Sequence, residues 1–234
     1  MLSAFLKGND IMIEILHIKK SYGKKTVLQD ISFSAEQGQC IGILGGNGSG
    51  KSTLLNVLSG VLSPDDGAFL YNGTDISKDS KKRSALLGYV PQGTPLLEEL
   101  TALDNLRLRY EKTDLHNLME NGVLKMLGID SFLKTPVHKM SGGMKKRLSI
   151  GCSVANNPRI LLLDEPSAAL DLVCKAKISD YLNDFRANGG IVVLATHDLQ
   201  EIPLCDKLYI LKNGCLYDYD FDGDIHRLAE NLEL

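Results

Sequence analysis

The most constraining feature of this chain is a glycine-rich segment that joins a short apolar run to a predicted helix. Residues 40–55 read CIGILGGNGSGKSTLL, and residues 45–52 fit the P-loop pattern G-x-x-x-x-G-K-[ST]. Gly45, Gly48 and Gly50 let the backbone wrap closely around an anion, because glycine reaches conformations closed to other residues. Exposed N–H groups and the positive end of the following helix then favour a phosphate. Since the pattern lies between a predicted strand and a predicted helix, we predict a phosphate-binding loop and not an ordinary turn.

Two side chains at the end of this loop predict the kind of phosphate. In the P-loop pattern, Lys51 is placed for the β- and γ-phosphates of a nucleoside triphosphate, and the Ser52 hydroxyl is placed for Mg²⁺. The segment therefore predicts triphosphate binding. Hydrolysis needs further groups, namely a carboxylate for the metal, a group that orients or deprotonates water, and positive charge at the γ-phosphate.

Composition narrows the class of protein. The 234 residues suit one large domain, or one domain with a modest insertion, and the net charge of −3 argues against a dedicated nucleic-acid binder. The compact basic runs at 81–83 and 145–147 are interpreted as solvated faces. Five scattered cysteines without C-x-x-C spacing indicate a reducing compartment and neither a disulfide framework nor a zinc site. No apolar run approaches the roughly 20 residues of a membrane helix. We therefore expect an intracellular protein that reaches a membrane only through a partner, with residues 1–11 as a short extension.

Continuous apolar runs predict the fold class. Residues 40–44, 160–164 and 191–196 are apolar at nearly every position, as in parallel strands that helices cover on both faces. Between positions 92 and 140 the apolar periodicity is helical, and a second helix is expected at 141–155. The acidic tail with Asp218, Asp220, Asp222 and Asp224 is interpreted as a solvated surface. The remaining predicted elements are strands at 11–18, 27–35, 68–71 and 86–90, helices at 51–59 and 172–187, and a hairpin at 207–218, with Tyr22-Gly23 in a turn. The predicted apolar face of the middle region consists of Leu115, Leu118, Met119, Val123, Met126 and Leu127.

Two adjacent carboxylates follow the apolar run at 160–164. A carboxylate at the end of a buried strand lies beside the P-loop, because the carboxyl ends of parallel strands share one edge of the sheet. Asp164 can hold Mg²⁺ directly or through water, and Glu165 is placed within a water's reach of the γ-phosphate, as a general base requires. The alternative, a solvated strand end, carries little weight with a P-loop upstream.

These residues resemble a known family. Residues 162–171 (LLDEPSAALD) resemble the Walker B motif and D-loop of ATP-binding cassette (ABC) ATPases, and residues 140–148 (MSGGMKKRL) resemble their L-S-G-G-Q signature. Residues 90–92 (VPQ) resemble the Q-loop, and residues 195–198 (ATHD) the switch-histidine loop. The motifs occur in the order of the family, over residues 12–217.

The resemblance implies a role for each matched residue. Glu165 would be the base, His197 would hold the γ-phosphate and its water, and Gln92 would link the site to the helical insertion. The residues that would hold Mg²⁺ are Ser52, Gln92 and Asp164. The residues that would bind ATP are Tyr22, by stacking on adenine, and Gly45, Gly46, Asn47, Gly48, Ser49, Gly50, Lys51, Ser52 and Thr53, with Lys51 also catalytic. Without the resemblance, Tyr22 would be a packing aromatic, and Gln92 and His197 ordinary polar residues at strand ends.

The resemblance also implies a second copy of the chain. Ser141, Gly142 and Gly143 would cap the γ-phosphate of ATP bound by another protomer, and Asp171 would contact that protomer. A Ser-Gly-Gly at a helix start also suits an anion in its own right, since it exposes N–H groups. Met140 and Met144 depart from the Leu and Gln of the signature; Met144, like the stretch at 101–106, resembles the drug- and antibiotic-exporting branch.

The sequence thus predicts one α/β domain with a P-loop NTPase core built on a parallel sheet, an antiparallel β subdomain and a helical insertion, the ABC ATPase fold. The core with its β subdomain is expected at 12–91 and 156–220, and the insertion with the signature at 92–155. The predicted function is an ATP-hydrolysing subunit that energises a membrane transporter, an exporter, through closure of two copies around ATP and Mg²⁺. Its partners would be a second ATPase subunit and a separate transmembrane permease at the inner face of the cell membrane, with no nucleic acid. The alternatives are a soluble ABC ATPase of an assembly or repair process, and a regulatory module that binds ATP without hydrolysing it; the presence of Glu165 and His197 argues against the second.

Overall fold

The computed structural model describes residues 11–110, 115, 118–119, 122–168 and 170–233, and its framework is one mixed sheet. The strands are β1 (Ile11–Tyr22), β2 (Lys25–Glu36), β3 (Cys40–Leu44), β4 (Asp66–Tyr71), β5 (Thr74–Asp75), β6 (Leu87–Val90), β7 (Ile160–Asp164), β8 (Ile191–Thr196), β9 (Lys207–Lys212) and β10 (Cys215–Asp218). The helices are α1 (Lys51–Ser59), α2 (Ser80–Leu86), α3 (Ala102–Arg107), α5 (Val123–Met126), α6 (Gly142–Ser153), α7 (Leu172–Ala187) and α8 (Ile225–Glu233), with short 3₁₀ helices η1 (Ile129–Phe132), η2 (Val137–Lys139) and η3 (Ile202–Leu204). Within the residue ranges given above, the sheet has ten strands in the order β5-β4-β1-β2-β10-β9-β3-β8-β7-β6.

The parallel part of the sheet gathers the predicted motifs at one edge. Strands β3, β8, β7 and β6 pair in parallel, with Leu44 opposite Thr196, Asp164 opposite Ala195, and Val90 opposite Leu163. Every residue of β3, β7 and β8 is buried, as expected for strands covered on both faces. Because these pairs are the last of each ladder, the loops that follow β3, β6, β7 and β8 all leave the sheet at its carboxyl edge.

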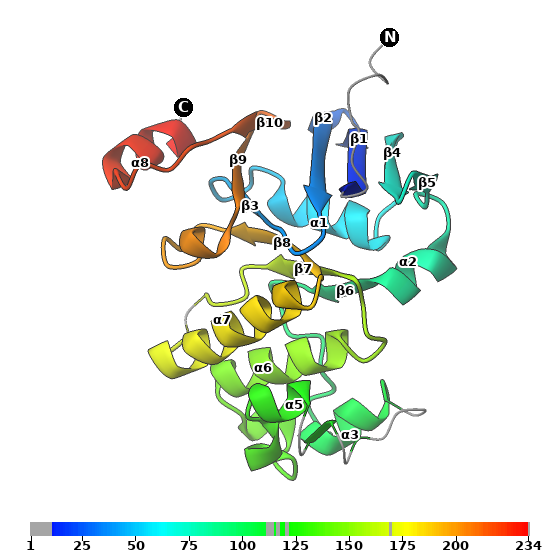
Figure 1. The fold of residues 1–234 in the computed structure, drawn as a ribbon, viewed down its shortest axis with the longest axis vertical. Coiled ribbons are helices and arrows are strands. Elements are labelled where there is room, and N and C mark those ends of the chain that lie inside the picture. The colour runs from blue at the N-terminus through cyan, green and yellow to red at the C-terminus, as the bar shows by residue number, and fades with distance from the viewer. Residues whose placement is uncertain (1–10, 111–114, 116–117, 120–121, 169, 234) are drawn as a thin grey trace.

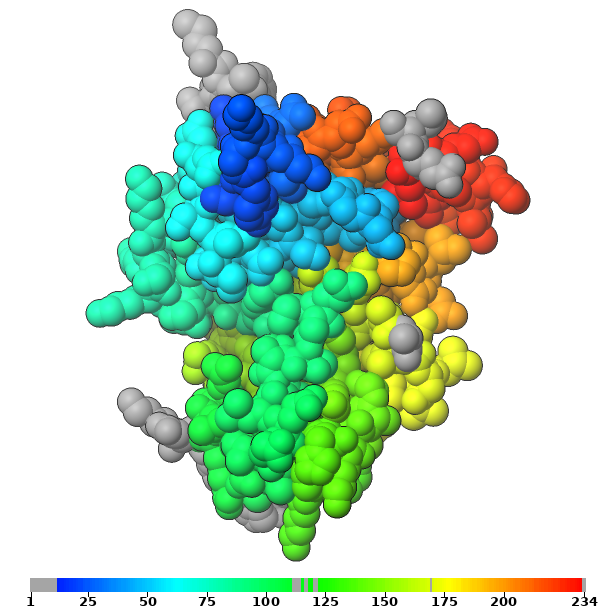
Figure 2. All heavy atoms as spheres, turned by 180° about the vertical axis from the view of Figure 1, so that it is seen from behind, coloured from blue at the N-terminus to red at the C-terminus, as the bar shows by residue number. Residues whose placement is uncertain are grey.

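Alternation along the strands divides the core between two layers of helices. Ile41 and Ile43 belong to a cluster with Leu54 and Leu58 of α1, on one face of the sheet. Leu161 and Leu163 point to the opposite face, in a cluster that includes residues of α6 and α7 such as Leu148 and Ile178. Figure 1 shows the result, with α7 beside the sheet and with α6, α5 and α3 below it. Figure 2 shows the same lower part, coloured green, from behind.

The antiparallel part extends further than the sequence predicts. The predicted strands at 11–18 and 27–35 are too short, since β1 and β2 form a hairpin of 12 residues each, paired up to Tyr22 opposite Lys25. Tyr22 is therefore the last residue of a strand and does not lie in the turn, which Gly23 enters at a φ of 59°. The polar residues 19–21 carry no apolar alternation, but the ladder between the two strands still pairs their backbones.

The helices near the site match their predicted positions within about two residues. Helix α1 begins after Gly50 and ends before Gly60, and helices α6 and α7 lie within the ranges expected for them. Helix α2 has no counterpart among the predicted elements. In the middle region, part of the predicted helix lies outside the described residues; in α5, Leu124 is buried and Met126 is exposed, so the prediction that Met126 faces the core is wrong.

The acidic tail is solvated as predicted, since its four aspartates are all exposed. Helix α8, which follows them, has no counterpart among the predicted elements; it rests on the carboxyl end of β3 through Leu228 and Leu232. Leu228 is buried against Leu44, Ile202 and Ile210. The run of aspartates at 218, 220, 222 and 224 drew the interpretation to the charge of this segment, and the short apolar repeat of Leu228 and Leu232 that anchors the helix was overlooked. Within the described residues, no helix combines the length and the apolar character needed to cross a membrane.

Candidate functional site

The P-loop has the backbone that the glycine pattern predicts. Gly48 and Gly50 adopt φ values of 79° and 111°, in the region that side chains rarely enter. Gly45 has another reason, because a Cβ there would lie 2.5 Å from Ser49 Oγ and 2.9 Å from the Leu211 carbonyl oxygen. The loop ends in α1, whose first residue is Lys51, so free N–H groups of the helix point into the loop. The P-loop backbone thus forms a concave loop, called the cradle below, in which larger residues could not replace Gly45, Gly48 and Gly50 without strain or a clash.

Lys51 lies folded over this cradle. Its Nζ donates to the carbonyl oxygens of Gly45, at 2.6 Å, and Gly46, at 3.2 Å, and its side chain is buried. Burial lowers the pKa of Lys51, while the carboxylates of Glu165 and Asp164 oppose this shift. The ammonium group is thus held by two neutral acceptors beside two acidic groups, and it is close to where a phosphate in the cradle would carry its charge.

Glu165 is the centre of the polar contacts at the sheet edge. Gln92 Nε2 donates to Glu165 Oε2 at 3.0 Å, and His197 Nδ1 lies 2.9 Å from Glu165 Oε1. The Glu165 side chain is 9% exposed, whereas that of His197 is 55% exposed. The three predicted residues therefore come together from three loops, after β6, β7 and β8. This arrangement fixes both oxygens of one carboxylate, as a base that must accept a proton in a defined direction requires.

Asp164 precedes this carboxylate at the end of β7 and is almost completely buried. Burial raises the pKa of Asp164, against the Ser52 hydroxyl and the cations of Lys51 and Lys146, which lower it. Adjacent Glu165 raises it further. An acid whose charge is disfavoured in this way is a natural ligand for a cation, because a bound cation would compensate the buried charge.

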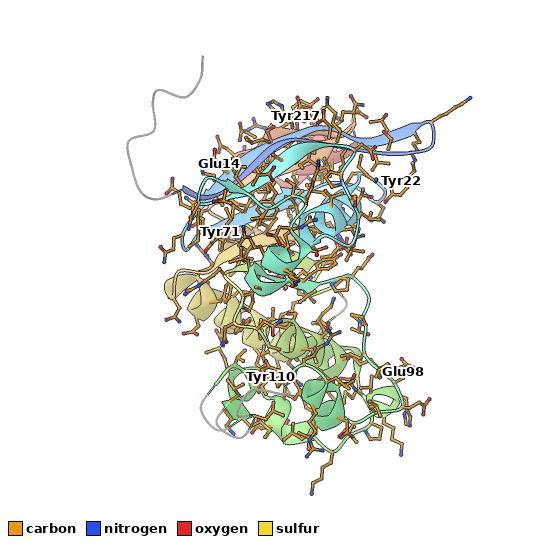
Figure 3. The ribbon with its side chains drawn as sticks, turned by 90° about the vertical axis from the view of Figure 1, so that its right-hand side faces the viewer. Glu14, Tyr22, Tyr71, Glu98, Tyr110 and Tyr217 are labelled. Carbon is orange, nitrogen blue, oxygen red and sulfur yellow. The ribbon has the colours of Figure 1, made fainter. Side chains whose placement is uncertain are left out.

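The predicted loops border two cavities that share Glu165. A cavity of about 240 Å³ is lined by P-loop residues together with Val27, Gln92 and Glu165. A second cavity of about 500 Å³ lies on the other side of Glu165, next to His197 and Lys175. Glu165 is thus the wall between the P-loop and the histidine loop. Tyr22, at the tip of the β1–β2 hairpin, is 49% exposed, and Figure 3 shows it projecting from the upper part of the molecule.

The signature and D-loop residues lie at the start of two neighbouring helices. Ser141 accepts from the Met144 N–H and caps α6, and Asp171 accepts from the Cys174 N–H and caps α7. The two helix starts are in close contact, because a Cβ on Gly143 would lie 2.5 Å from Cys174 Sγ. These residues do not line the P-loop cavity of their own chain. Ser141, Gly142 and Asp171 are exposed, as a surface that meets another molecule requires.

Sequence patterns missed the burial of three charged residues, of which Lys146 and Glu201 lie near the site. The interpretation of 145–147 as a solvated face is wrong, since Lys146 is only 5% exposed and donates to the Pro91 and Gln92 carbonyl oxygens. The same interpretation of 81–83 is wrong for Arg83, which is buried and donates to the Val57 carbonyl oxygen. For Lys146 the helical spacing was a signal in the sequence. Lys146 lies three residues after Gly143 and four before Ile150, on the same face of the helix, and Gly143 and Ile150 are both buried. Glu201, a buried carboxylate four residues after His197, carries no such signal.

More than half of the chain matches a family model. Residues 28–168, from within β2 into the loop after β7, match a model described as ABC transporter. The chain belongs to the ABC transporter family. Nod factor export ATP-binding protein I of Sinorhizobium fredii is 35% identical over 211 residues, which are 88% of this chain but 62% of that protein. Lantibiotic transport ATP-binding protein SrtF of Streptococcus pyogenes is 31% identical over 95% of this chain and 94% of its own length.

Solved structures of ABC proteins have the same fold as this chain. An ATP-binding subunit of an ABC transporter superposes with a TM-score of 0.80 at 27% identity, over 95% of both chains. A dimeric ATP-binding cassette bound to ADP and Pi, in a post-hydrolysis state, gives a TM-score of 0.79 at 27% identity, over 91% of this chain and all of that one. The predicted family, its fold and its ATPase class are thereby confirmed. This chain spans less than two thirds of the Nod factor relative.

Proposed function

We propose that this ABC subunit binds ATP in the P-loop cavity and hydrolyses it with Glu165 as the general base. The observation that carries the proposal is the position of Glu165, whose two carboxylate oxygens are held by Gln92 and His197 at the wall of the P-loop cavity. A water molecule between this carboxylate and a phosphate in the cradle would lose its proton to Glu165. His197, more exposed, would hold the phosphate side of that water.

The P-loop supplies the binding energy in this mechanism. Its N–H groups and the start of α1 bind phosphate oxygens, and Lys51 exchanges the Gly45 and Gly46 carbonyl oxygens for the charge of the nucleotide. Tyr22 would stack on the adenine ring from the β1–β2 hairpin. Lys51 and the start of α1 would thereby place positive charge at the γ-phosphate, where negative charge builds up during phosphoryl transfer.

The donors beside the P-loop fit Mg²⁺. The Ser52 hydroxyl faces the buried Asp164 carboxylate, and the Gln92 amide lines the same cavity; Mg²⁺ prefers oxygen ligands of these kinds. In the described part of the chain, no three His, Cys, Asp or Glu side chains converge on a metal position. Water and phosphate oxygens would therefore complete the shell, as is usual for Mg²⁺. When bound, the ion would neutralise charge on the β- and γ-phosphates.

A second copy would complete the site. Gly142 and Gly143 begin a helix of 12 residues that Ser141 caps, and Ser141 and Gly142 are exposed, so that N–H groups at this helix start can meet a phosphate held by another chain. Asp171, at the start of the adjacent α7, would contact that chain. We further propose that residues 12–91 and 156–220 form the nucleotide-binding core and residues 92–155 the helical insertion. The dimeric form of a structurally similar cassette supports the pairing of two copies.

The transport role follows from the relatives. They are named for Nod factor export, lantibiotic transport and linearmycin resistance, and each is an ATP-binding protein. We propose that this subunit likewise drives an exporter, docked on a transmembrane permease at the cytoplasmic face of the membrane. Co-sedimentation with membranes of the source cell that contain its permease partner tests this role; a chain that stays in the supernatant whether or not the permease is present would contradict it.

The substitution Glu165→Gln tests the hydrolytic role. Because glutamine cannot accept the proton, turnover should fall by about 10²- to 10⁴-fold while ATP binding is retained. The variant should accumulate as an ATP-held dimer in size-exclusion chromatography. Glu98→Gln is a matched control, since Glu98 is an exposed carboxylate that pairs with Lys145. If Glu165→Gln hydrolyses ATP at the rate of the parent protein, Glu165 is not the base.

A further inference from the structure

Lys146 lies at an unusual place for a lysine. It is the fifth residue of α6, and only 5% of it is exposed. Its Nζ donates to the Pro91 carbonyl oxygen at 3.1 Å and to the Gln92 carbonyl oxygen at 3.2 Å. Its neighbour Lys145 points outward and pairs with Glu98 at 3.1 Å. Lys146 thus joins the signature helix to the backbone that carries Gln92.

The surroundings of Lys146 act on its charge in two opposite ways. Burial lowers the pKa of Lys146, and the carboxylates of Asp164, Glu201 and Glu165 oppose that shift. A buried cation destabilises a fold unless hydrogen bonds and opposite charges compensate for lost hydration. Here the hydrogen bonds come from main-chain carbonyls, which cannot turn away as side chains can. The ammonium group is therefore fixed in position relative to the backbone of Pro91 and Gln92.

The contacts continue from Lys146 to the proposed base. Gln92 has its carbonyl oxygen on Lys146 and its side-chain amide on Glu165 Oε2. Glu165 in turn contacts His197 through its other oxygen. Ser141 caps the first turn of the helix that carries Lys146, 5 residues upstream, so a displacement of α6 changes the position of the Gln92 backbone by direct contact.

We propose that Lys146 is a positioning residue that couples the signature helix α6 to Glu165 through Gln92. The inference rests on the proposed function, in which Glu165 is the base and the start of α6 meets ATP on a second copy. Seating of that helix on the nucleotide of the other chain then sets the position from which Gln92 presents its amide to Glu165. Lys146 does not line the P-loop cavity, so its removal should change the rate of hydrolysis and leave nucleotide binding almost unaltered.

The test compares four variants of the full chain. Lys146→Met removes the donor and the charge at similar length, Lys146→Arg keeps both, and Lys145→Met is the matched control on the surface of the same helix. Glu165→Gln reports on the proposed base. For each variant we would measure the Kd of ATP by calorimetry, kcat and KM of ATP hydrolysis, and the midpoint of thermal unfolding.

The expected result is a split between rate and binding. Lys146→Met should lower kcat at least tenfold, with the Kd and KM of ATP within about threefold of the parent values, because only a step after binding is affected. Lys146→Arg should restore at least a third of the parent kcat, and Lys145→Met should match the parent. If Lys146→Met does not fold, Lys146→Leu, which likewise lacks the donor and the charge, replaces it with the same expectation of lower kcat at unchanged Kd.

Three outcomes would overturn the inference. One is a folded Lys146→Met with kcat within twofold of the parent; another is a loss of kcat in proportion to a loss of folded protein; the third is a Lys146→Arg that is as slow as Lys146→Met. The proposed function fails separately, if Glu165→Gln keeps the parent rate. A silent Lys146→Met beside an inactive Glu165→Gln refutes the coupling alone.

Discussion

Replacing Glu201 by glutamine is expected to stabilise the protein at neutral pH. Glu201 is 6% exposed, follows the loop that carries His197, and has one carboxylate oxygen, Oε2, without a hydrogen-bond partner in the described structure. Burial is the largest influence on its titration and raises the pKa of Glu201, whereas Ser167 and Thr196 lower it. Removing the negative charge therefore removes the dominant unfavourable contribution.

The size of the effect follows from this balance. A buried polar atom without a partner costs about 1–3 kcal/mol, and more when the group is charged. Glutamine keeps the shape but leaves a neutral atom at the same place, so we expect a gain of about 1–2 kcal/mol in the free energy of unfolding. For a chain of this size that corresponds to a rise of about 2–8 °C in Tm. The lost attraction for Lys146 acts in the opposite direction, but that lysine keeps two carbonyl acceptors.

The pH dependence gives the sign check. A carboxyl whose pKa is higher in the folded than in the unfolded chain binds more protons when folded, so the parent loses stability as pH rises from the ordinary value of 4.5 to the folded value. Below that window the carboxyl is protonated in both states. The Tm difference between Glu201→Gln and the parent should therefore be small near pH 4.5, grow as pH rises, and level off above the folded pKa.

Thermal melts followed by circular dichroism across this range would check the prediction. The exposed Glu98→Gln variant is the control and should shift the free energy of unfolding by less than about 0.5 kcal/mol at every pH. A Glu201→Gln protein that is less stable than the parent at pH 8 would refute the reasoning. So would a stability gain that does not change between pH 5 and pH 8.

Three further predictions concern the site. Lys51→Ala should weaken ATP binding at least tenfold by calorimetry, because it removes the buried cation of the cradle, and an unchanged Kd would refute the P-loop assignment. Asp164→Asn should raise the Mg²⁺ concentration needed for half-maximal hydrolysis, measured by titration at saturating ATP; an unchanged requirement would exclude this carboxylate from the metal site. Gly143→Ala should cost about 1–3 kcal/mol in denaturant unfolding, since its Cβ would lie 2.5 Å from Cys174 Sγ, and Cys174→Ala should recover part of that loss.

The sequence was sufficient for the parts of the site that depend on backbone patterns. Glycine spacing predicts the loop before α1, and continuous apolar runs predict β3, β7 and β8 as neighbours in a parallel sheet. Once those strands are parallel, the residues that follow them must meet at one edge, which is why Gln92, Glu165 and His197 could be placed together. The contacts at Glu165 agree with this expectation to within hydrogen-bond distance.

Side-chain burial could not be predicted where charge and helix position disagree. Lys145, Lys146 and Arg147 form a basic run, but a helix turns about 100° per residue, so the three side chains point in different directions. Lys146 enters the core, and Arg147 donates to the Leu127 carbonyl oxygen and lies 5.1 Å from the centre of the Phe132 ring. Which of the three turns inward depends on where α6 packs against the sheet, and composition does not encode that position. Helix α8 was missed because Leu228 packs on residues such as Leu44 that are distant in the chain, and the burial of Glu201 likewise depends on tertiary packing.

The conformation of Glu165 shows how tightly the proposed base is specified. Glu165 has a φ of 49°, although it is not glycine, and its N–H donates to the Ala195 carbonyl oxygen of β8 at 2.8 Å. Such a conformation costs of order 1 kcal/mol and persists only where the surroundings determine it. At this position the chain turns directly out of β7 and directs the carboxylate between Gln92 and His197. A residue that followed β7 in extended conformation would direct its side chain elsewhere, so the cost of the turn is explained by the position of the carboxylate. The strained backbone and the contacts with Gln92 and His197 together orient the Glu165 carboxylate toward the P-loop. Lys146 adds to this by holding the backbone of Gln92.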